Sequence, residues 1–169
     1  MNLYKIIITG PESSGKTTLC ELLSNHFNIP FTKEFARSYI ENLDRSYIIG
    51  DLLSIAKEQL KSELNSQLLD TDLITIKIWS EYKYGKCDNW ILDQIEKQKT
   101  EKRFYLLCKP DITWQPDKQR ENPNDREALY KVYKQELESL GHICFVIKGK
   151  DREQSAKDIM KILENKSRN

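Results

Sequence analysis

The chain has 169 residues, a length that suits one domain with a buried hydrophobic core. Its formal net charge of +1 gives no bulk argument for binding nucleic acid or an acidic membrane surface. Its apolar runs are far shorter than a membrane span, and a strand-like run begins too early to leave room for a signal peptide. We therefore expect one cytoplasmic domain over residues 1–169, with no membrane or nucleic-acid partner.

The first predicted elements are a strand over residues 3–9 and a helix that runs to Phe27, joined by a loop with the pattern G-x-x-x-x-G-K-T. This order is typical of a phosphate-binding loop, in which glycines let the backbone approach a polyphosphate and the helix adds its positive end. Lys16 is expected to reach the β- and γ-phosphates, and the Thr17 hydroxyl to bind Mg²⁺. The predicted nucleotide-binding residues are Gly10, Glu12, Ser13, Ser14, Gly15, Lys16, Thr17 and Thr18.

A short strand over residues 29–32 is predicted next, followed by Glu34 and, one helical turn later, Arg37. In a phosphotransferase, a carboxylate at this place can accept the proton of an attacking hydroxyl. Arg37 can then bind a substrate or phosphoryl oxygen. The alternative is an ordinary Glu–Arg pair on a helix surface, which is common and weak.

Two acids end the following strand, which is predicted over residues 67–72 after a helix that Asp51 caps. Asp70 is the natural partner for a magnesium ion held by the phosphate-binding loop, although it can also cap the next helix. Asp72 either caps the helix at Leu73 or binds a substrate hydroxyl. Both Glu34 and Asp72 remain candidates for the general base.

A polar stretch with three prolines covers residues 109–124 and predicts a long mobile loop. Together with Arg126 it forms a predicted lid over about residues 109–126. We expect Arg120 and Arg126 to close over the phosphates and stabilise charge in the transition state. The predicted catalytic residues are thus Lys16, Glu34, Arg120 and Arg126.

Strands and helices alternate along the whole length. The later predicted elements are helices over residues 73–84, 88–99 and 125–140 and from Asp151, and strands over residues 103–108 and 142–147. The alternation predicts a three-layer α/β/α fold around a mainly five-stranded parallel sheet. Ligands of such sheets bind at the carboxyl ends of the strands, where all of the predicted site residues fall.

Four motifs resemble one known family. They are G-P-E-S-S-G-K-T-T-L at residues 10–19, E-F-A-R-S-Y at residues 34–39, L-D-T-D-L-I-T at residues 69–75 and L-L-C-K-P-D-I-T-W-Q-P-D-K-Q-R at residues 106–120. With them, nearly the whole chain resembles the ribosylnicotinamide kinase domain of NadR-type proteins of NAD metabolism, a P-loop kinase family. The resemblance implies ATP-dependent phosphorylation of nicotinamide riboside to nicotinamide mononucleotide in NAD salvage, with ATP and Mg²⁺ as cofactors.

By motif match, Lys16 and Thr17 would serve ATP and magnesium. The resemblance assigns Glu34, Arg37, Asp70 and Asp72 to the acceptor and metal side, and Arg120 and Arg126 to the lid. Larger family members add an adenylyltransferase domain and some a DNA-binding domain; this chain starts at the kinase strand, so we expect neither activity. The alternatives are a kinase for another nucleoside or nucleotide, and a regulatory ATPase without a small-molecule acceptor. The choice between ATP and GTP stays open, as does the oligomeric state.

Overall fold

Five parallel strands form the central sheet of the described residues, in the order β2-β3-β1-β4-β5. The computed structural model describes residues 4–167, so the predicted strand start at Leu3 lies outside the described residues. The strands are β1 (Lys5–Thr9), β2 (Phe31–Thr32), β3 (Leu68–Asp70), β4 (Arg103–Cys108) and β5 (Ile143–Ile147). The predicted five-stranded parallel sheet is therefore confirmed.

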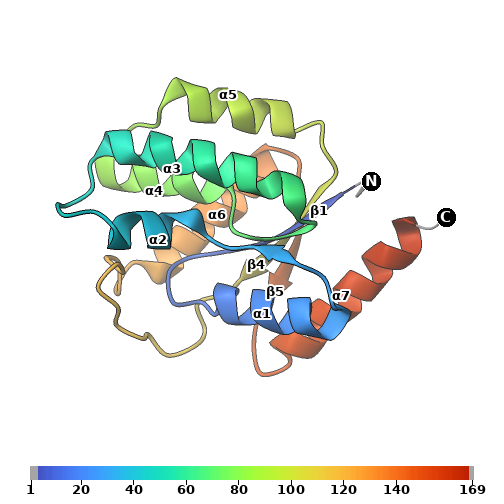
Figure 1. The fold of residues 1–169 in the computed structure, drawn as a ribbon. Helices are drawn as coiled ribbons and strands as arrows, with labels where there is room; N and C mark the ends of the chain where they lie inside the picture. The colour runs from blue at the N-terminus through green and yellow to red at the C-terminus, as the bar shows by residue number, and fades with distance from the viewer. Residues whose placement is uncertain (1–3, 168–169) are drawn as a thin grey trace.

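Helices cover both faces of the sheet and complete the three predicted layers (Figure 1). They are α1 (Lys16–Phe27), α2 (Phe35–Glu41), α3 (Ile49–Ser62), α4 (Leu73–Tyr84), α5 (Asn89–Gln98), α6 (Arg126–Ser139) and α7 (Arg152–Ser167), with a short 3₁₀ turn at Glu63–Asn65. Ile6 and Ile8 of β1 pack with α1 and α7, whereas Ile7 faces the cluster formed by α2 to α6. No helix in residues 4–167 is long and apolar enough to cross a membrane.

Two elements begin or end at residues other than those predicted, namely the start of α3 and the end of β3. Asp51 was expected to precede α3, but it lies in the first turn, and its carboxylate accepts the Ile48 N–H at 2.8 Å. Thus Asp51 supplies the acidic half of a capping box from inside the helix. The strand predicted over residues 67–72 stops at Asp70, because Thr71 adopts a left-handed φ of 65°.

A buried ionic cluster joins the start of α4 to β4. One Asp72 oxygen caps α4 by accepting the Ile74 N–H at 3.0 Å. The other accepts hydrogen bonds from the Arg103 guanidinium at 3.1 Å and the Tyr105 hydroxyl at 2.7 Å. Arg103 also pairs with Glu63 at 3.1 Å, and burial raises the pKa of Glu63 to about 7. One guanidinium therefore neutralises two buried carboxyl groups and fixes α4 on the sheet.

We expect Arg103→Ala to lower the free energy of unfolding by about 3–5 kcal/mol, because it leaves Asp72 and Glu63 buried without their cation. Chemical denaturation followed by circular dichroism measures this change. The control is Lys99→Ala, which removes an exposed pair with Glu96 and is expected to cost less than about 1 kcal/mol. Equal losses in the two variants would show that the cluster does not hold the fold.

Candidate active site

The phosphate-binding loop lies between β1 and α1, in the order that the sequence predicts. Gly10 has a φ of 137°, and a Cβ there would lie 2.6 Å from the Cys108 carbonyl oxygen, so no other residue fits without displacing backbone. The Ser14 hydroxyl and the Lys16 ammonium both donate to the Pro11 carbonyl, at 2.7 Å and 2.8 Å. The loop is thus already curved, with Lys16 folded back over it.

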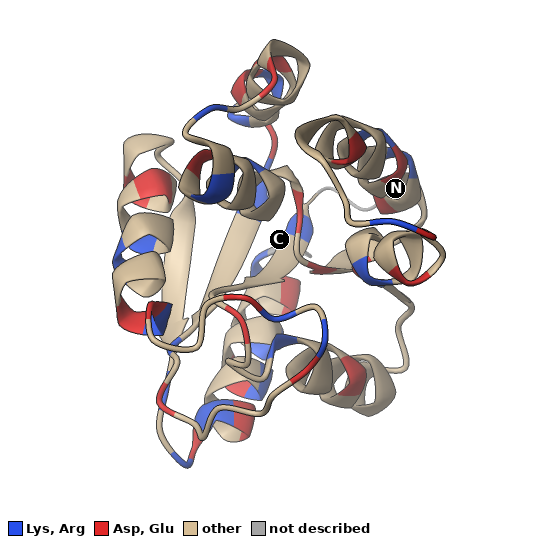
Figure 2. Cartoon of the chain, turned by 90° about the vertical axis from the view of Figure 1, so that its left-hand side faces the viewer, with Lys and Arg blue, Asp and Glu red and all other residues tan. Residues whose placement is uncertain are grey.

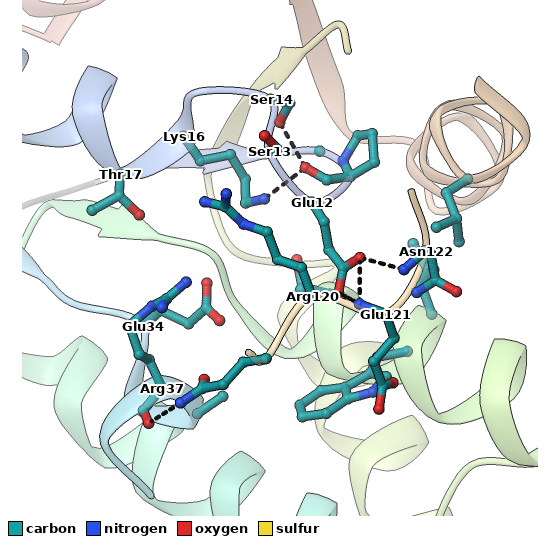
Figure 3. Close-up of a pocket in the computed structure, with 18 of the residues that line it drawn as sticks. Glu12, Ser13, Ser14, Lys16, Thr17, Glu34, Arg37, Arg120, Glu121 and Asn122 are labelled. Carbon is teal, nitrogen blue, oxygen red and sulfur yellow. Dashed lines mark hydrogen bonds between the residues drawn. The ribbon is translucent and has the colours of Figure 1, made fainter. Parts of the chain in front are cut away.

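A cavity of about 510 Å³ opens beside this loop (Figure 3). The loop and the start of α1 line it with all of the predicted nucleotide-binding residues. Helices α2, α4 and α6 contribute apolar and aromatic side chains: Ala36, Ile40, Ile78, Trp79, Tyr82, Leu129 and Tyr133. The cavity therefore combines a polar wall suited to phosphates with a wall suited to a flat organic ring.

Thr17 and Asp70 lie together, as expected for a magnesium pair. The Thr17 hydroxyl donates to one Asp70 oxygen at 2.7 Å, while the other, buried oxygen has no hydrogen-bond partner in residues 4–167. Burial raises the pKa of Asp70, and the hydrogen bond from Thr17 opposes that rise. A hydroxyl and an unsatisfied carboxylate oxygen fit the oxygen ligands that Mg²⁺ prefers. The described residues hold no group of three acidic, histidine or cysteine ligands, so phosphate oxygens or waters would complete the coordination.

Glu34 follows β2, lines the cavity and is half-buried. Figure 3 shows it across the cavity from Lys16. Burial raises the pKa of Glu34, and the positive charge of Lys16 is the main opposing influence. Its carboxylate does not cap α2, and none of the hydrogen bonds within the described part of the chain reaches it. A free carboxylate with a raised pKa is suited to accept a proton from a ligand hydroxyl.

The predicted lid is the segment 109–125 between β4 and α6, without Arg126, which begins α6; acidic and basic positions are mixed along it (Figure 2). Arg37 lines the cavity and also ties the lid to α2, since its guanidinium donates to Asp117 at 2.9 Å. The lid is attached to the phosphate-binding loop as well, because the Gln115 N–H donates to the Ser13 hydroxyl at 2.9 Å. The lid therefore lies over the cavity.

The two arginines that were predicted for the lid, Arg120 and Arg126, have different positions. Arg120 lines the cavity, where Figure 3 shows its guanidinium near Lys16, and it also donates to the Gln115 carbonyl. Arg126 does not line the cavity; it donates to the carbonyls of Ser13 and Ile112, each at 3.0 Å, and lies over the Trp114 ring. The expected contact of Arg126 with transferred phosphate is therefore not supported, because its guanidinium fastens the lid instead.

Asp72 does not line the cavity either. The substrate-binding and general-base roles considered for it are wrong, since it is fully buried and both oxygens are engaged by Ile74, Arg103 and Tyr105. The capping role, the alternative drawn from the sequence, is the one that the structure has. Glu34 alone remains as the candidate base.

Two interactions of the site were missed in the sequence. Glu12 was expected to bind nucleotide, yet its carboxylate accepts the N–H groups of Glu121 and Asn122 in the lid. Arg152, at the start of α7, donates to the Ser14 carbonyl at 2.8 Å and pairs with Asp111. The Glu12 hydrogen bonds and the Arg152–Ser14 hydrogen bond each join residues more than a hundred positions apart in the sequence, and Arg152 and Asp111 are 41 positions apart. No local sequence pattern marks such partners.

Solved structures share this fold. A NadR protein in complex with NR is 22% identical with a TM-score of 0.69, and the match covers 92% of this chain and 50% of that one. YorR from Bacillus subtilis, in complex with phosphorylated GDP, is 18% identical (TM-score 0.58; 97% and 98% covered). Shikimate kinase from Acinetobacter baumannii, in complex with shikimate, is 16% identical (TM-score 0.54; 96% and 93% covered).

These likenesses confirm the P-loop kinase fold and, at the level of fold, the resemblance to the NadR-type domain. The chain spans about half the length of the NadR protein. No curated protein matches it in sequence. The sequence model of the AAA domain family matches residues 5–154, from β1 to the start of α7, and this range includes the phosphate-binding loop, Asp70 and the lid. Because the match takes in most of the chain, the protein belongs to the AAA domain family.

Proposed function

We propose that the protein is an ATP-dependent kinase that phosphorylates the ribose hydroxyl of nicotinamide riboside and forms nicotinamide mononucleotide. The observation that carries the proposal is the single cavity that brings Lys16 and the phosphate-binding loop together with Glu34. A nucleotide-binding protein without transfer activity needs the loop alone. A kinase also needs a base within the same cavity, and Glu34 is a free carboxylate with a raised pKa.

The chemistry follows from the charges in the cavity. The loop amides and Lys16 hold the triphosphate, and Glu34 orients the acceptor hydroxyl and takes its proton. A bond forms between the acceptor oxygen and the γ-phosphorus while the bond from that phosphorus to the bridging oxygen breaks, leaving ADP. Arg120 stabilises the negative charge on the phosphoryl group in transfer. Thr17 and Asp70 would hold Mg²⁺, which when bound neutralises charge on the phosphates.

The apolar wall supports a nucleoside as the acceptor. Trp79, Ile78 and Tyr133 lie where a ring can be buried, while Glu34 and Arg37 offer polar contacts for a sugar. The Trp79 N–H is already bonded to the Tyr47 hydroxyl at 3.0 Å, which fixes the orientation of the indole. The fold shared with a NadR protein that was solved with NR supports nicotinamide riboside among nucleosides.

A panel of nucleosides and nucleotides incubated with ATP and Mg²⁺, with products identified by mass, tests this proposal. We expect nicotinamide riboside to gain one phosphoryl group faster than the other acceptors. Rapid phosphorylation of another nucleoside without turnover of nicotinamide riboside would move the proposal to that acceptor. Binding of ATP without any phosphorylated product would favour the regulatory ATPase.

Glu34→Gln is expected to lower kcat about 10²–10⁴-fold, because it removes the proton acceptor and keeps the shape of the side chain. In the unchanged protein, activity requires the ionised carboxylate. Since burial raises the pKa of Glu34, the loss of activity on acidification should begin above the usual glutamate range. Rate measurements against pH check both points, with the exposed Glu41→Gln of the same helix as control. A variant Glu34→Gln with unchanged turnover would remove Glu34 from the chemistry.

Arg120→Ala is expected to lower kcat at least about 10³-fold while ATP affinity changes little, because an arginine of this kind acts on transition-state charge. Steady-state kinetics and ATP titration measure the two quantities separately. The exposed lid residue Lys118, which does not line the cavity, provides the control Lys118→Ala. Equal losses in turnover and in ATP affinity would instead assign Arg120 to ground-state binding.

A further inference from the structure

Glu12 is an acid inside a loop built for phosphates, where a second negative charge opposes the ligand. Its side chain leaves the loop and reaches the lid (Figure 3). One carboxylate oxygen accepts the N–H groups of Asn122 at 2.9 Å and Glu121 at 3.1 Å, and the other lies 3.2 Å from the Glu121 nitrogen. Glu12 lines the cavity, but both of its carboxylate oxygens are engaged by lid backbone N–H groups.

The lid supplies a site of matching chemistry. The N–H groups of Glu121 and Asn122 are consecutive, and successive backbone N–H groups form a small concave site for an anion. Hydrogen bonds to a carboxylate are stronger than those between neutral groups. The contact therefore fixes the backbone of two lid residues against the phosphate-binding loop.

These two residues directly follow Arg120. Fixing the backbone on its C-terminal side limits where its guanidinium can point, and Figure 3 shows the guanidinium in the cavity near Lys16. Gln115 makes two of these contacts: its carbonyl accepts a hydrogen bond from Arg120, and its N–H donates to the Ser13 hydroxyl. Both ends of the segment from Gln115 to Asn122 are thus fastened to neighbouring residues of the phosphate-binding loop.

Other contacts of the lid reach the helices around the cavity. Asp117 pairs with Arg37 of α2, and the Glu121 side chain binds Lys83 of α4 and the Tyr47 hydroxyl, each at 2.7 Å. These pairs are partly exposed and contribute little each. They also place the lid relative to the helices, whereas Glu12 places it relative to the loop that would hold the reacting phosphates.

We propose that Glu12 is a positioning residue: its carboxylate holds Glu121 and Asn122 against the phosphate-binding loop and thereby aims Arg120 at the phosphate site. This inference rests on the proposed kinase function for its effect on rate, but the contact itself is independent of activity. The role differs from the nucleotide contact that the sequence led us to expect of Glu12.

The first test measures hydrogen exchange of the Glu121 and Asn122 amides by nuclear magnetic resonance, in the full chain without nucleotide. Glu12→Gln keeps one acceptor oxygen and loses the charge, and Glu12→Ala loses both. We expect exchange at these amides to rise in that order, by about 10- to 100-fold in Glu12→Ala, while core amides of β1 stay unchanged. The control is Glu21→Gln on the exposed side of α1. Unchanged exchange at both amides would overturn the inference.

The second test is a double-mutant cycle between Glu12→Gln and Arg120→Ala. We expect Glu12→Gln alone to lower kcat about tenfold with little change in KM for ATP, and to cause no further loss when Arg120 is already alanine. Additive losses, or a loss confined to KM for ATP, would show that Glu12 acts on the nucleotide and would overturn the inference. If the unchanged protein transfers no phosphoryl group, the kinase proposal fails, and the amide exchange still decides whether Glu12 holds the lid.

Discussion

The site depends on the close approach of Gly10 to the carbonyl oxygen of Cys108. This contact lies at the carboxyl ends of β1 and β4, which are neighbours in the sheet. The phosphate-binding loop leaves the sheet from β1, and the lid leaves it from β4. Because the two backbones touch where both segments begin, the loop and the lid start at a fixed separation. A side chain at position 10 would separate them before any later contact formed.

The parallel sheet brings the other groups to the same edge. Ile8 of β1 is in register with Asp70 of β3, so the Asp70 carboxylate emerges beside the phosphate-binding loop and Thr17. The next strand, β2, ends just before Glu34. The sheet order β2-β3-β1-β4 thus arranges Glu34, Asp70, the phosphate-binding loop and the lid in one row. Helices α2, α4 and α6 then close the cavity with apolar side chains.

Local patterns in the sequence were sufficient for the strands, the phosphate-binding loop and the irregular segment between β4 and α6, because each is specified by neighbouring residues such as the glycines around Lys16. They were insufficient for the direction of side chains. Asp72 stands at the edge of the sheet that was predicted for the site, but its side chain caps α4 and turns inward to Arg103. In the sequence, Arg103 was no more than the first residue of a predicted strand. Arg126 and Glu12 differ from expectation for the same reason. Their partners are backbone groups of distant segments, which carry no signature in residue type.

The attachment of the lid to both walls of the cavity has a consequence for how dissolved salt acts on the protein. The pairs of Asp117 with Arg37 and of Glu121 with Lys83 are partly exposed, and dissolved salt weakens ion pairs that are exposed to solvent. The hydrogen bonds of Arg126 to backbone carbonyls pair no opposite charges, and they are affected less. Rising ionic strength therefore loosens the side of the lid that faces α2 and α4 while the side on the phosphate-binding loop stays attached. At high ionic strength the lid would therefore stay attached to the phosphate-binding loop and open first above the apolar wall of the cavity.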